Sequence, residues 1–154
     1  MSGTLQSLVE NEKGEKKRTA TEGLLWLLRG LSFTCTALQS SQADEKEELS
    51  ASFTKGYEGT LKKHHNFVIK GVFSVRITSR LRSGFLIISH IKVAMKACPY
   101  RKDFYAKVAA DPDGGAPASV ERLNEALNKW LAALSAIVKQ MEAFYEEGGY
   151  NKGF

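Results

Sequence analysis

The residues best suited to metal binding or nucleophilic catalysis are two adjacent histidines and two cysteines, and their spacing argues against both kinds of chemistry. Side chains of neighbours such as His64 and His65 diverge by about 100° on a helix, so they are poorly placed to hold one metal ion. Cys35 and Cys98 are far apart without a Cys-x-x-Cys spacing, which favours small buried residues over a disulfide or metal clip. We therefore expect no catalytic residue, no metal ligand and no cofactor.

The short motifs that mark many enzymes are also absent from the sequence. There is no glycine-rich dinucleotide fingerprint, phosphate-binding loop, His-Glu-x-x-His helix or Gly-x-Ser-x-Gly turn. Nothing places either histidine beside a thiol as a catalytic base. We interpret the chain as a non-enzymatic protein.

The strongest candidate for ligand binding is a tryptophan on an apolar helix. Trp26 is followed one turn later by Gly30, which removes the side chain that would otherwise cover the indole ring. An exposed indole presents a flat apolar face and an N–H donor. Generic frequencies favour an ordinary core role for Trp26 and a surface role for His65. Both interpretations stay open on these grounds.

The elements that must position Trp26 are predicted to be helices. From Thr19 or Thr21 to about Ser40, apolar residues recur at steps of three and four and form two stripes, as in a helix buried between two layers. A second helix is predicted from Asp44 to about Lys63, with one side packed inward. A long helix is predicted from an N-cap at Ser119 to Gly148–Gly149, with its apolar residues facing one way.

The ends and the middle of the chain are less regular. The polar segment Ser2–Arg18 is interpreted as a frayed helix end and linker, with order beginning after it. Phe67–Phe73 and Phe85–Val93 are rich in β-branched residues and are compatible with a strand pair. We prefer a helix for His65–Ser74, because a lone two-stranded hairpin is only marginally stable.

The charge distribution limits the classes of partner that we expect this chain to bind. The chain has 154 residues, 43% apolar and 25% charged, with a net charge of +5. Val75–Lys92 supplies four of these positive charges without an acidic residue, so the rest is nearly neutral and carries no basic stripe for nucleic acid. No secretory signal and no membrane-spanning apolar run are seen. We expect one domain, a cytoplasmic location and no nucleic-acid partner.

Three stretches, in this order, resemble the glycolipid transfer protein family, especially fungal members related to a heterokaryon-incompatibility protein. They are ATEGLLWLLRGLSF at residues 20–33, TLKKHHNF at 60–67 and ACPYRKDFY at 97–105. The similarity covers most of the chain apart from Val75–Lys92 and the loop Asp111–Pro117. It implies a single all-α domain over residues 1–154, a two-layer helical sandwich whose layers part to admit sphingolipid chains.

The resemblance also implies roles for individual residues. Trp26 matches the family's tryptophan that stacks on the first sugar, and His65 matches its histidine that hydrogen-bonds the ceramide amide. Phe67 falls where the family has an aromatic residue that touches the membrane. The remaining candidates for ligand binding, mainly in the acyl-chain pocket, are Leu28, Phe33, Val72, Phe73 and Tyr150. The implied partners are a glycosphingolipid and, transiently, a membrane surface.

The sequence departs from the family's pattern in two places. The family's leading helices, which carry an acidic residue, an asparagine and a lysine that bind sugar and amide, have no counterpart here. We therefore expect an incomplete sandwich with exposed apolar faces and poor solubility. Without Val75–Lys92, Lys70–Ser74 would run directly into Val93–Tyr100 as in the family. We interpret these 18 residues as an insertion extruded as a loop, and hypothesise that they are an intron read through in frame.

The leading functional interpretation is the binding of sphingolipids with a sugar headgroup and their transfer between membranes. The alternatives are a helical interaction module without lipid cargo and an inactive truncated product. Transfer of lipids with a phosphate headgroup, as in relatives specific for ceramide-1-phosphate, is disfavoured because such sites use clustered cations.

Overall fold

The structure, a computed structural model, describes residues 3–65, 95 and 97–154. The described residues form helices without a strand. The predicted insertion at Val75–Lys92, the predicted roles of Phe67, Val72 and Phe73, and nearly all of the predicted helix at His65–Ser74 and of the alternative strands at Phe67–Phe73 and Phe85–Val93 lie outside them. The named helices are α1 (Leu5–Asn11), α2 (Thr19–Ala43), α3 (Leu49–Gly59), α6 (Arg101–Ala109) and α7 (Val120–Glu147).

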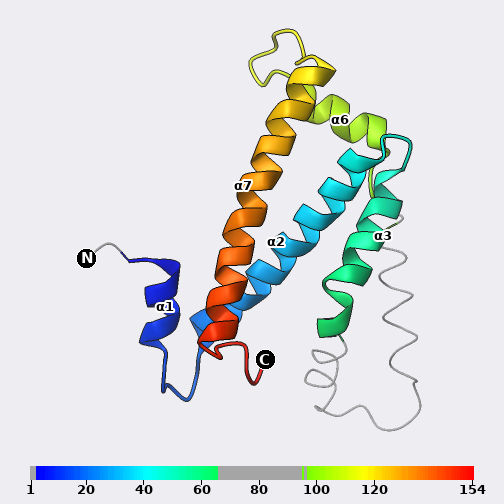
Figure 1. The fold of residues 1–154 in the computed structure, drawn as a ribbon. Helices are drawn as coiled ribbons and strands as arrows, with labels where there is room; N and C mark the ends of the chain where they lie inside the picture. The colour runs from blue at the N-terminus through cyan, green and yellow to red at the C-terminus, as the bar shows by residue number, and fades with distance from the viewer. Residues whose placement is uncertain (1–2, 66–94, 96) are drawn as a thin grey trace, which may run out of the picture.

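The long helix α2 lies at the centre of the arrangement, with α7 packed on one side and α3 on the other (Figure 1). The short helix α1 lies beside the first turns of α2, and α6 packs against α7 at the opposite end. The prediction that the helix from Thr19 or Thr21 is packed from two sides is confirmed. None of the described helices is long and apolar enough to cross a membrane.

The expectation that order begins only after Arg18 is wrong, because α1 is a capped and anchored helix. Thr4 and Ser7 form a capping box at its start, and Val9 is buried in the core. After the helix, the Glu12 carboxylate accepts hydrogen bonds from the backbone N–H groups of Ala20 and Thr21 at 2.9 and 2.8 Å. These bonds lower the pKa of Glu12 and satisfy free N–H groups at the start of α2.

The backbones of α2 and α3 approach each other closely where the two helices cross. A Cβ atom built on Gly56 would lie 2.9 Å from the Cβ of Ala37, so only glycine fits at this crossing. The predicted start of this helix at Asp44 is wrong, because the acidic side chains before Leu49 are used elsewhere. Asp44 accepts a hydrogen bond from the Lys46 N–H, and Glu47 binds Ser52 and Lys55. The named helix also ends at Gly59, before Lys63, and residues 62–65 are again helical.

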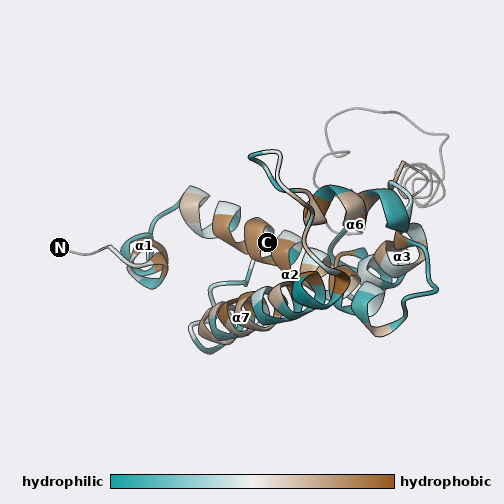
Figure 2. Cartoon of the chain, turned by 90° about the horizontal axis from the view of Figure 1, so that it is seen from above, coloured by the Kyte–Doolittle hydropathy of each residue, from teal (hydrophilic) through white to brown (hydrophobic). Residues whose placement is uncertain are grey.

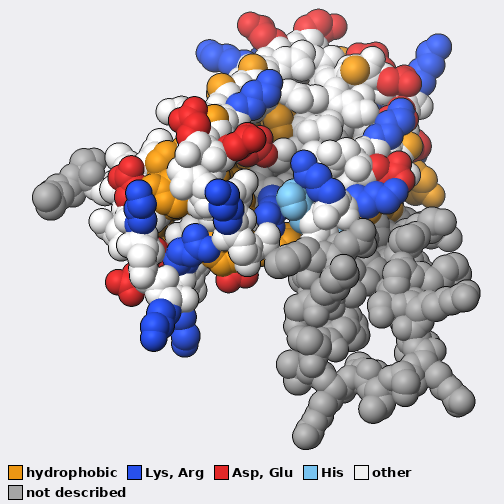
Figure 3. Space-filling view, turned by 60° about the horizontal axis from the view of Figure 1, so that its bottom comes forward, with side chains coloured by type: hydrophobic (Ala, Val, Ile, Leu, Met, Phe, Trp, Pro, Cys, Tyr) orange, Lys and Arg blue, Asp and Glu red, His pale blue; other side chains and the backbone are white. Residues whose placement is uncertain are grey.

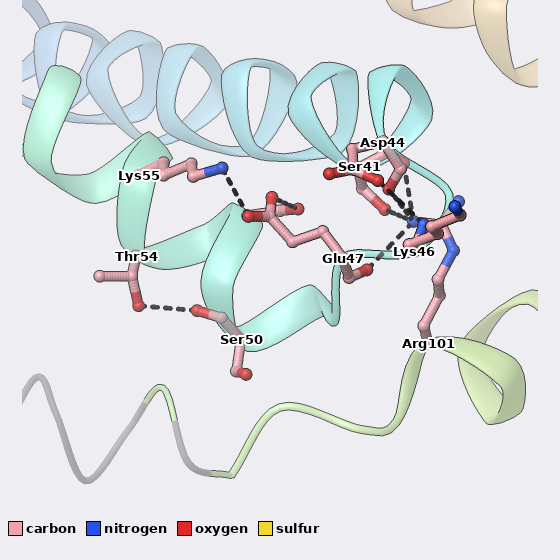
Figure 4. Close-up of polar contacts among 9 residues, drawn as sticks. Ser41, Asp44, Lys46, Glu47, Ser50, Thr54, Lys55 and Arg101 are labelled. Atoms are coloured by element: carbon pink, nitrogen blue, oxygen red, sulfur yellow. Dashed lines mark hydrogen bonds and ion pairs between the residues drawn. The ribbon is translucent and has the colours of Figure 1, made fainter.

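An arginine of α6 caps the C-terminal end of α2. The Arg101 guanidinium donates to the backbone carbonyl and the hydroxyl of Ser41, both at 2.6 Å (Figure 4). It also reaches the carbonyl oxygens of Asp44 and Glu47. The bond to Ser41 satisfies a carbonyl group in the last turn of α2 that has no partner within the helix, and the other two bonds hold the loop that follows.

The final helix is confirmed from its cap at Ser119, which accepts from the Arg122 N–H, to its end before Gly148. The prediction that its apolar residues all face one way is wrong. Leu131, Val138, Met141 and Tyr145 are buried, whereas Val120, Trp130 and Ile137 are exposed, because the described helices cover only one side of α7. Hydrophilic and hydrophobic residues therefore alternate around α7 in Figure 2. The Tyr145 hydroxyl donates to the Thr21 carbonyl at 2.8 Å and ties α7 to α2.

Two clusters of buried apolar side chains form much of the core of the described residues. One lies where α1, α2 and α7 meet, and the other lies farther along α2. The first contains Val9, Leu24, Leu25, Leu28, Met141 and Tyr145. The second contains Cys35, Leu38 and Leu131, with Phe53 and Phe104 packed against it.

Candidate functional site

Trp26 lies on α2 and is half-buried, so its ring is not enclosed by the core. The guanidinium of Arg29, one turn later, lies over the indole at 4.5 Å from the ring centroid. Residues three apart share a helix face, which makes this cation–π contact local. Burial lowers the pKa of Arg29, but a guanidinium remains charged at neutral pH. One face of the indole is therefore occupied by a fixed cation.

Open space flanks the same side of α2. Gly23 lies three residues before Trp26 and Gly30 lies four residues after it, so all three share a helix face. A Cβ atom at either glycine would meet nothing within 4 Å. Side chains at these positions would reach into the space beside the ring. The glycines therefore leave the indole accessible along the helix.

His65 is held by a tyrosine of α3. The Tyr57 hydroxyl lies 3.1 Å from Nδ1 of His65, and the ring centroids are 5.4 Å apart. Burial raises the pKa of Tyr57 and lowers that of His65. At neutral pH the pair is therefore a neutral hydroxyl beside a neutral imidazole.

A cavity of about 160 Å³ lies next to residues that adjoin Trp26 and His65. Arg29, which covers Trp26, lines one side, and His64, the neighbour of His65, lines another. The cavity is bounded by α2, α7 and the segment after α3. Its full lining is Arg29, Ser32, Gly59, Thr60, Lys63, His64 and Glu142. Neither Trp26 nor His65 lines this cavity, but the residue that covers Trp26 and the residue next to His65 in the chain both do.

His64 is an uncharged group in cationic surroundings. Burial, with smaller contributions from the charges of Arg29, Lys63 and His65, lowers its pKa to about 4. Figure 3 shows a histidine flanked by Lys and Arg side chains on this face of the molecule. At neutral pH the imidazole can donate one hydrogen bond and accept another.

The other predicted ligand-binding residues fall on two sides of α2. Leu28 is a core residue, 3% exposed, and Tyr150 packs against the same cluster. The ring of Tyr150 stacks on Phe144 with centroids 5.0 Å apart. Phe33 instead meets Phe53 of α3 edge-on at 5.5 Å. Among the described residues, Leu28 and Tyr150 are brought together and Phe33 is not.

Sequence reasoning missed most of the cavity lining. The spacing of Arg29 from Trp26 was a usable signal, because i and i+3 residues meet on a helix. Tyr57 was not predicted as a site residue. Lys63 and Glu142 come from segments distant in the sequence, so no local pattern could have joined them.

A larger cavity of about 550 Å³ lies between α3 and the segment before α6. It is lined by Glu48, Ser50, Ala51, Thr54, Met95, Cys98, Pro99 and Tyr100. None of the predicted site residues is among them. The smaller cavity therefore holds the candidate site.

Comparison with known proteins gives consistent matches. The family model described as glycolipid transfer protein matches residues 1–79, a range that includes Trp26 and His65. A glycolipid transfer protein of Aureobasidium melanogenum is 43% identical over 143 residues, covering 93% of this chain and 58% of that protein. The chain thus spans less than two thirds of that relative's length.

Solved structures agree on the fold. The crystal structure of HET-C2, a fungal glycolipid transfer protein, matches with a TM-score of 0.66 and 41% identity, over 92% of this chain and 58% of that one. Mouse ceramide-1-phosphate transfer protein in its apo form matches with a TM-score of 0.68 and 19% identity, over 95% of this chain and 63% of that one. The prediction of an all-α helical sandwich is confirmed.

Proposed function

Since this chain belongs to the glycolipid transfer protein family, we propose that it binds a sphingolipid with a sugar headgroup and carries it between membranes. The proposal includes no covalent chemistry, a transient contact with the membrane surface and a cytoplasmic location. The observation that carries it is the half-buried indole of Trp26 beside open space at Gly23 and Gly30.

Trp26 is assigned to the sugar ring. Arg29 covers one face of the indole, so a sugar would stack its C–H groups on the opposite face. The guanidinium holds the indole in place and stays within reach of hydroxyl groups at the sugar's edge. Carbohydrate recognition would thus combine an apolar face with charged donors at its border.

His65 is assigned to the amide of the lipid. Among the described residues the Tyr57 hydroxyl has only His65 as a hydrogen-bond partner, and a buried hydroxyl needs an acceptor for its proton. With Tyr57 donating to Nδ1, the imidazole proton sits on Nε2. His65 then donates a hydrogen bond, which fits the carbonyl oxygen of an amide.

The apolar candidates keep their predicted roles as proposals. Leu28 and Tyr150 lie together beside α7, whereas Phe33 lies on the α3 side of α2. Phe67, Val72 and Phe73 lie outside the described residues, and the resemblance alone supports their assignment to the membrane contact and the acyl-chain pocket.

The two tryptophans of the chain provide a matched test. Trp26→Ala removes the proposed stacking surface, whereas Trp130→Ala removes an exposed indole, 51% accessible, on the outside of α7. Movement of a fluorescent glycolipid between vesicles should fall at least about tenfold in the first variant, as expected for losing a good stacking partner. The second variant should transfer like the parent. Equal rates in both variants, with helicity retained, would overturn the assignment.

A second candidate function is a helical interaction module without lipid cargo. The exposed Val120, Trp130 and Ile137 of α7 favour it, because exposed apolar residues often mark partner surfaces. Under this function the parent would take up no glycolipid, and Trp130→Ala would weaken partner binding.

We also propose that Val75–Lys92 is an insertion in the family's pattern. The range matched by the family model ends at residue 79, inside this segment. Sequencing the transcript across Ser74 and Val93 tests whether the segment is an intron, and a spliced message that retains it would reject that origin.

A further inference from the structure

The layer that α2 and α7 form together has one polar face. A cavity of about 190 Å³ lies on this face, between the two helices. The buried Cys35 and Val138 contribute to its lining. The rest of the lining is polar and consists of Ser32, Thr36, Gln39, Ser135, Lys139 and Glu142. These side chains can hydrogen-bond to water, so this face is suited to solvent.

The opposite face of the same two helices is apolar. Because successive residues turn by about 100° around a helix, Leu27 lies about 180° from Thr36 on α2, and Ile137 lies about 160° from Lys139 on α7. Leu27, Trp130 and Ile137 are 56%, 51% and 55% exposed. Half-buried leucines lie between them on both helices. The apolar face is defined by Leu27, Leu31, Leu127, Trp130, Leu134 and Ile137.

The apolar face has the size that a protein–protein interface requires. A helix is about 10 Å wide and rises about 1.5 Å per residue, so a face two helices wide and about three turns long measures roughly 20 Å by 20 Å. A standard interface buries about 800 Å² on each partner, of which somewhat more than half is apolar. The apolar face therefore offers about the apolar area that one partner contributes to a dimer.

The order of side-chain sizes along α7 suits a second copy of this chain. Ala126, Trp130, Ala133 and Ile137 are all exposed and follow one another at steps of four, three and four residues, so they form one stripe. In an antiparallel pair with a twofold axis between positions 131 and 132, Trp130 would face Ala133 of the second copy. Ile137 would likewise face Ala126. Each large side chain then meets a small one, which allows close helix packing.

The charges around this stripe are also compatible with a second copy. The stripe itself contains no charged residue, and its exposed border on α7 holds Arg122, Lys129, Gln140 and Glu147. This mixture of charges differs from the basic border of a helix that binds a membrane surface. In the antiparallel pair Arg122 would lie beside Gln140 of the second copy. No charge is then buried without a partner.

We propose that two copies of this chain associate through the apolar face, with their α7 helices antiparallel about a twofold axis. An interface of this kind uses the same surface on both copies, so association ends at the dimer. The inference does not rest on the proposed function. None of the residues of the apolar face lines the cavity next to Trp26, so each copy keeps its own candidate site.

Two adjacent alanines of α7 provide a matched test. Ala133 lies in the stripe, whereas Ala132 is equally exposed but points about 100° away from it. Sedimentation equilibrium of the full chain at roughly 1–100 µM should show a monomer that becomes a dimer as the concentration rises. Ala133→Glu should raise the dimer Kd at least about 100-fold, because it buries an unpaired charge. Ala132→Glu should leave the Kd unchanged.

Mixing two variants tests the twofold arrangement. Position 133 lies close to the proposed axis, so Ala133→Glu and Ala133→Lys each bring like charges together in their own dimers. An equimolar mixture should associate more tightly than either variant alone, since opposite charges then meet. A mixture that associates no better than its components overturns the arrangement. Equal Kd values for Ala132→Glu and Ala133→Glu, with helicity retained, also overturn it.

A third measurement leaves the apolar face unmodified. Trp26→Phe makes Trp130 the single tryptophan of the chain, and acrylamide should quench its fluorescence less at 100 µM than at 1 µM. A protein that stays monomeric over this range, or that forms assemblies larger than a dimer, overturns the inference. A monomer whose Trp130 emission shifts to shorter wavelength on phosphatidylcholine vesicles also overturns it, because the face would then contact a membrane.

Discussion

The Tyr57 hydroxyl lies 3.1 Å from Nδ1 of His65, and this contact decides which ring nitrogen is available to a ligand. Tyr57 is buried on α3, whereas His65 is half-buried on the helical turn that follows α3. Because the hydroxyl is held by the helix packing, the imidazole orientation is set before any ligand arrives. Nε2 is then the nitrogen that faces a ligand with its proton.

Tyr57→Phe should release this constraint. We expect glycolipid transfer to fall by about three- to tenfold, because a neutral hydrogen bond contributes about 1 kcal/mol. Nitrogen chemical shifts of His65 should change from a pure Nε2–H tautomer to a mixture. Tyr105→Phe is the control, since that hydroxyl bonds Ser41 and Gln42 at the other end of α2. An Nδ1–H tautomer in the parent would contradict the prediction.

Substitution by alanine at Gly30 and at Gly56 should change the free energy of unfolding in opposite directions. At Gly30 the added methyl group meets open space, so Gly30→Ala should raise the free energy of unfolding by about 0.5–1 kcal/mol through helix propensity. At Gly56 the methyl group would lie 2.9 Å from the Cβ of Ala37, so Gly56→Ala should lower it by about 1–3 kcal/mol. Urea denaturation of both variants measures the difference, and shifts of the same sign would contradict this packing.

The open space at Gly30 also predicts a functional variant. Gly30→Leu adds a side chain near the Trp26 ring, and its Cβ would meet nothing within 4 Å, so we expect helicity and unfolding to stay near the parent's. Glycolipid transfer should nevertheless fall at least about fivefold, because the leucine occupies the sugar's position. Gly30→Ala serves as the small-residue control. Undiminished transfer by Gly30→Leu would place the sugar elsewhere.

Arg101→Ala should destabilise the end of α2. The buried Ser41 would lose both bonds at 2.6 Å, and hydrogen bonds to a charged group contribute about 1.5–3 kcal/mol. We expect the free energy of unfolding to fall by that amount in urea titrations. Lys102→Ala, at an exposed position of α6, should change it by less than about 0.5 kcal/mol. Similar values for the two variants would show that the network contributes nothing.

Stability should fall on mild acidification because of His64. Its pKa is about 4 in the folded protein and about 6.5 in an unfolded chain. Between these values the unfolded state binds a proton that the folded state does not, so the free energy of unfolding decreases as the pH drops. Because solvent screens the charge at this half-buried site, we expect a loss of about 1–2 kcal/mol from pH 7 to pH 4.

The matched variant for this prediction is His64→Gln. Carboxylates titrate in both proteins, so the difference between their unfolding free energies isolates the histidine. That difference should be largest at pH 7 and shrink as the pH approaches 4. Parallel pH profiles for parent and variant would refute the assigned pKa.

Local interactions explain which helices could be predicted. The cap at Ser119 acts within three residues, and the apolar stripes around Trp26 repeat within one turn, so both long helices follow from neighbouring residues. The segment before Arg18 could not be predicted in this way. Its order depends on the burial of Val9 beside α2 and on the bonds from Ala20 and Thr21 to Glu12.

The candidate site, too, could be predicted from the sequence only in part. From the sequence alone come the all-helical fold class and the selection of Trp26, with Gly30 one turn later, and of His65 as candidate ligand-binding residues, because spacing along a helix and a resemblance over short stretches are readable without coordinates. Only the tertiary structure decided that Arg29, Lys63, His64 and Glu142 share one cavity and that Tyr57 orients His65. The reason is physical: these groups come from separate helices, and helix packing determines their distances.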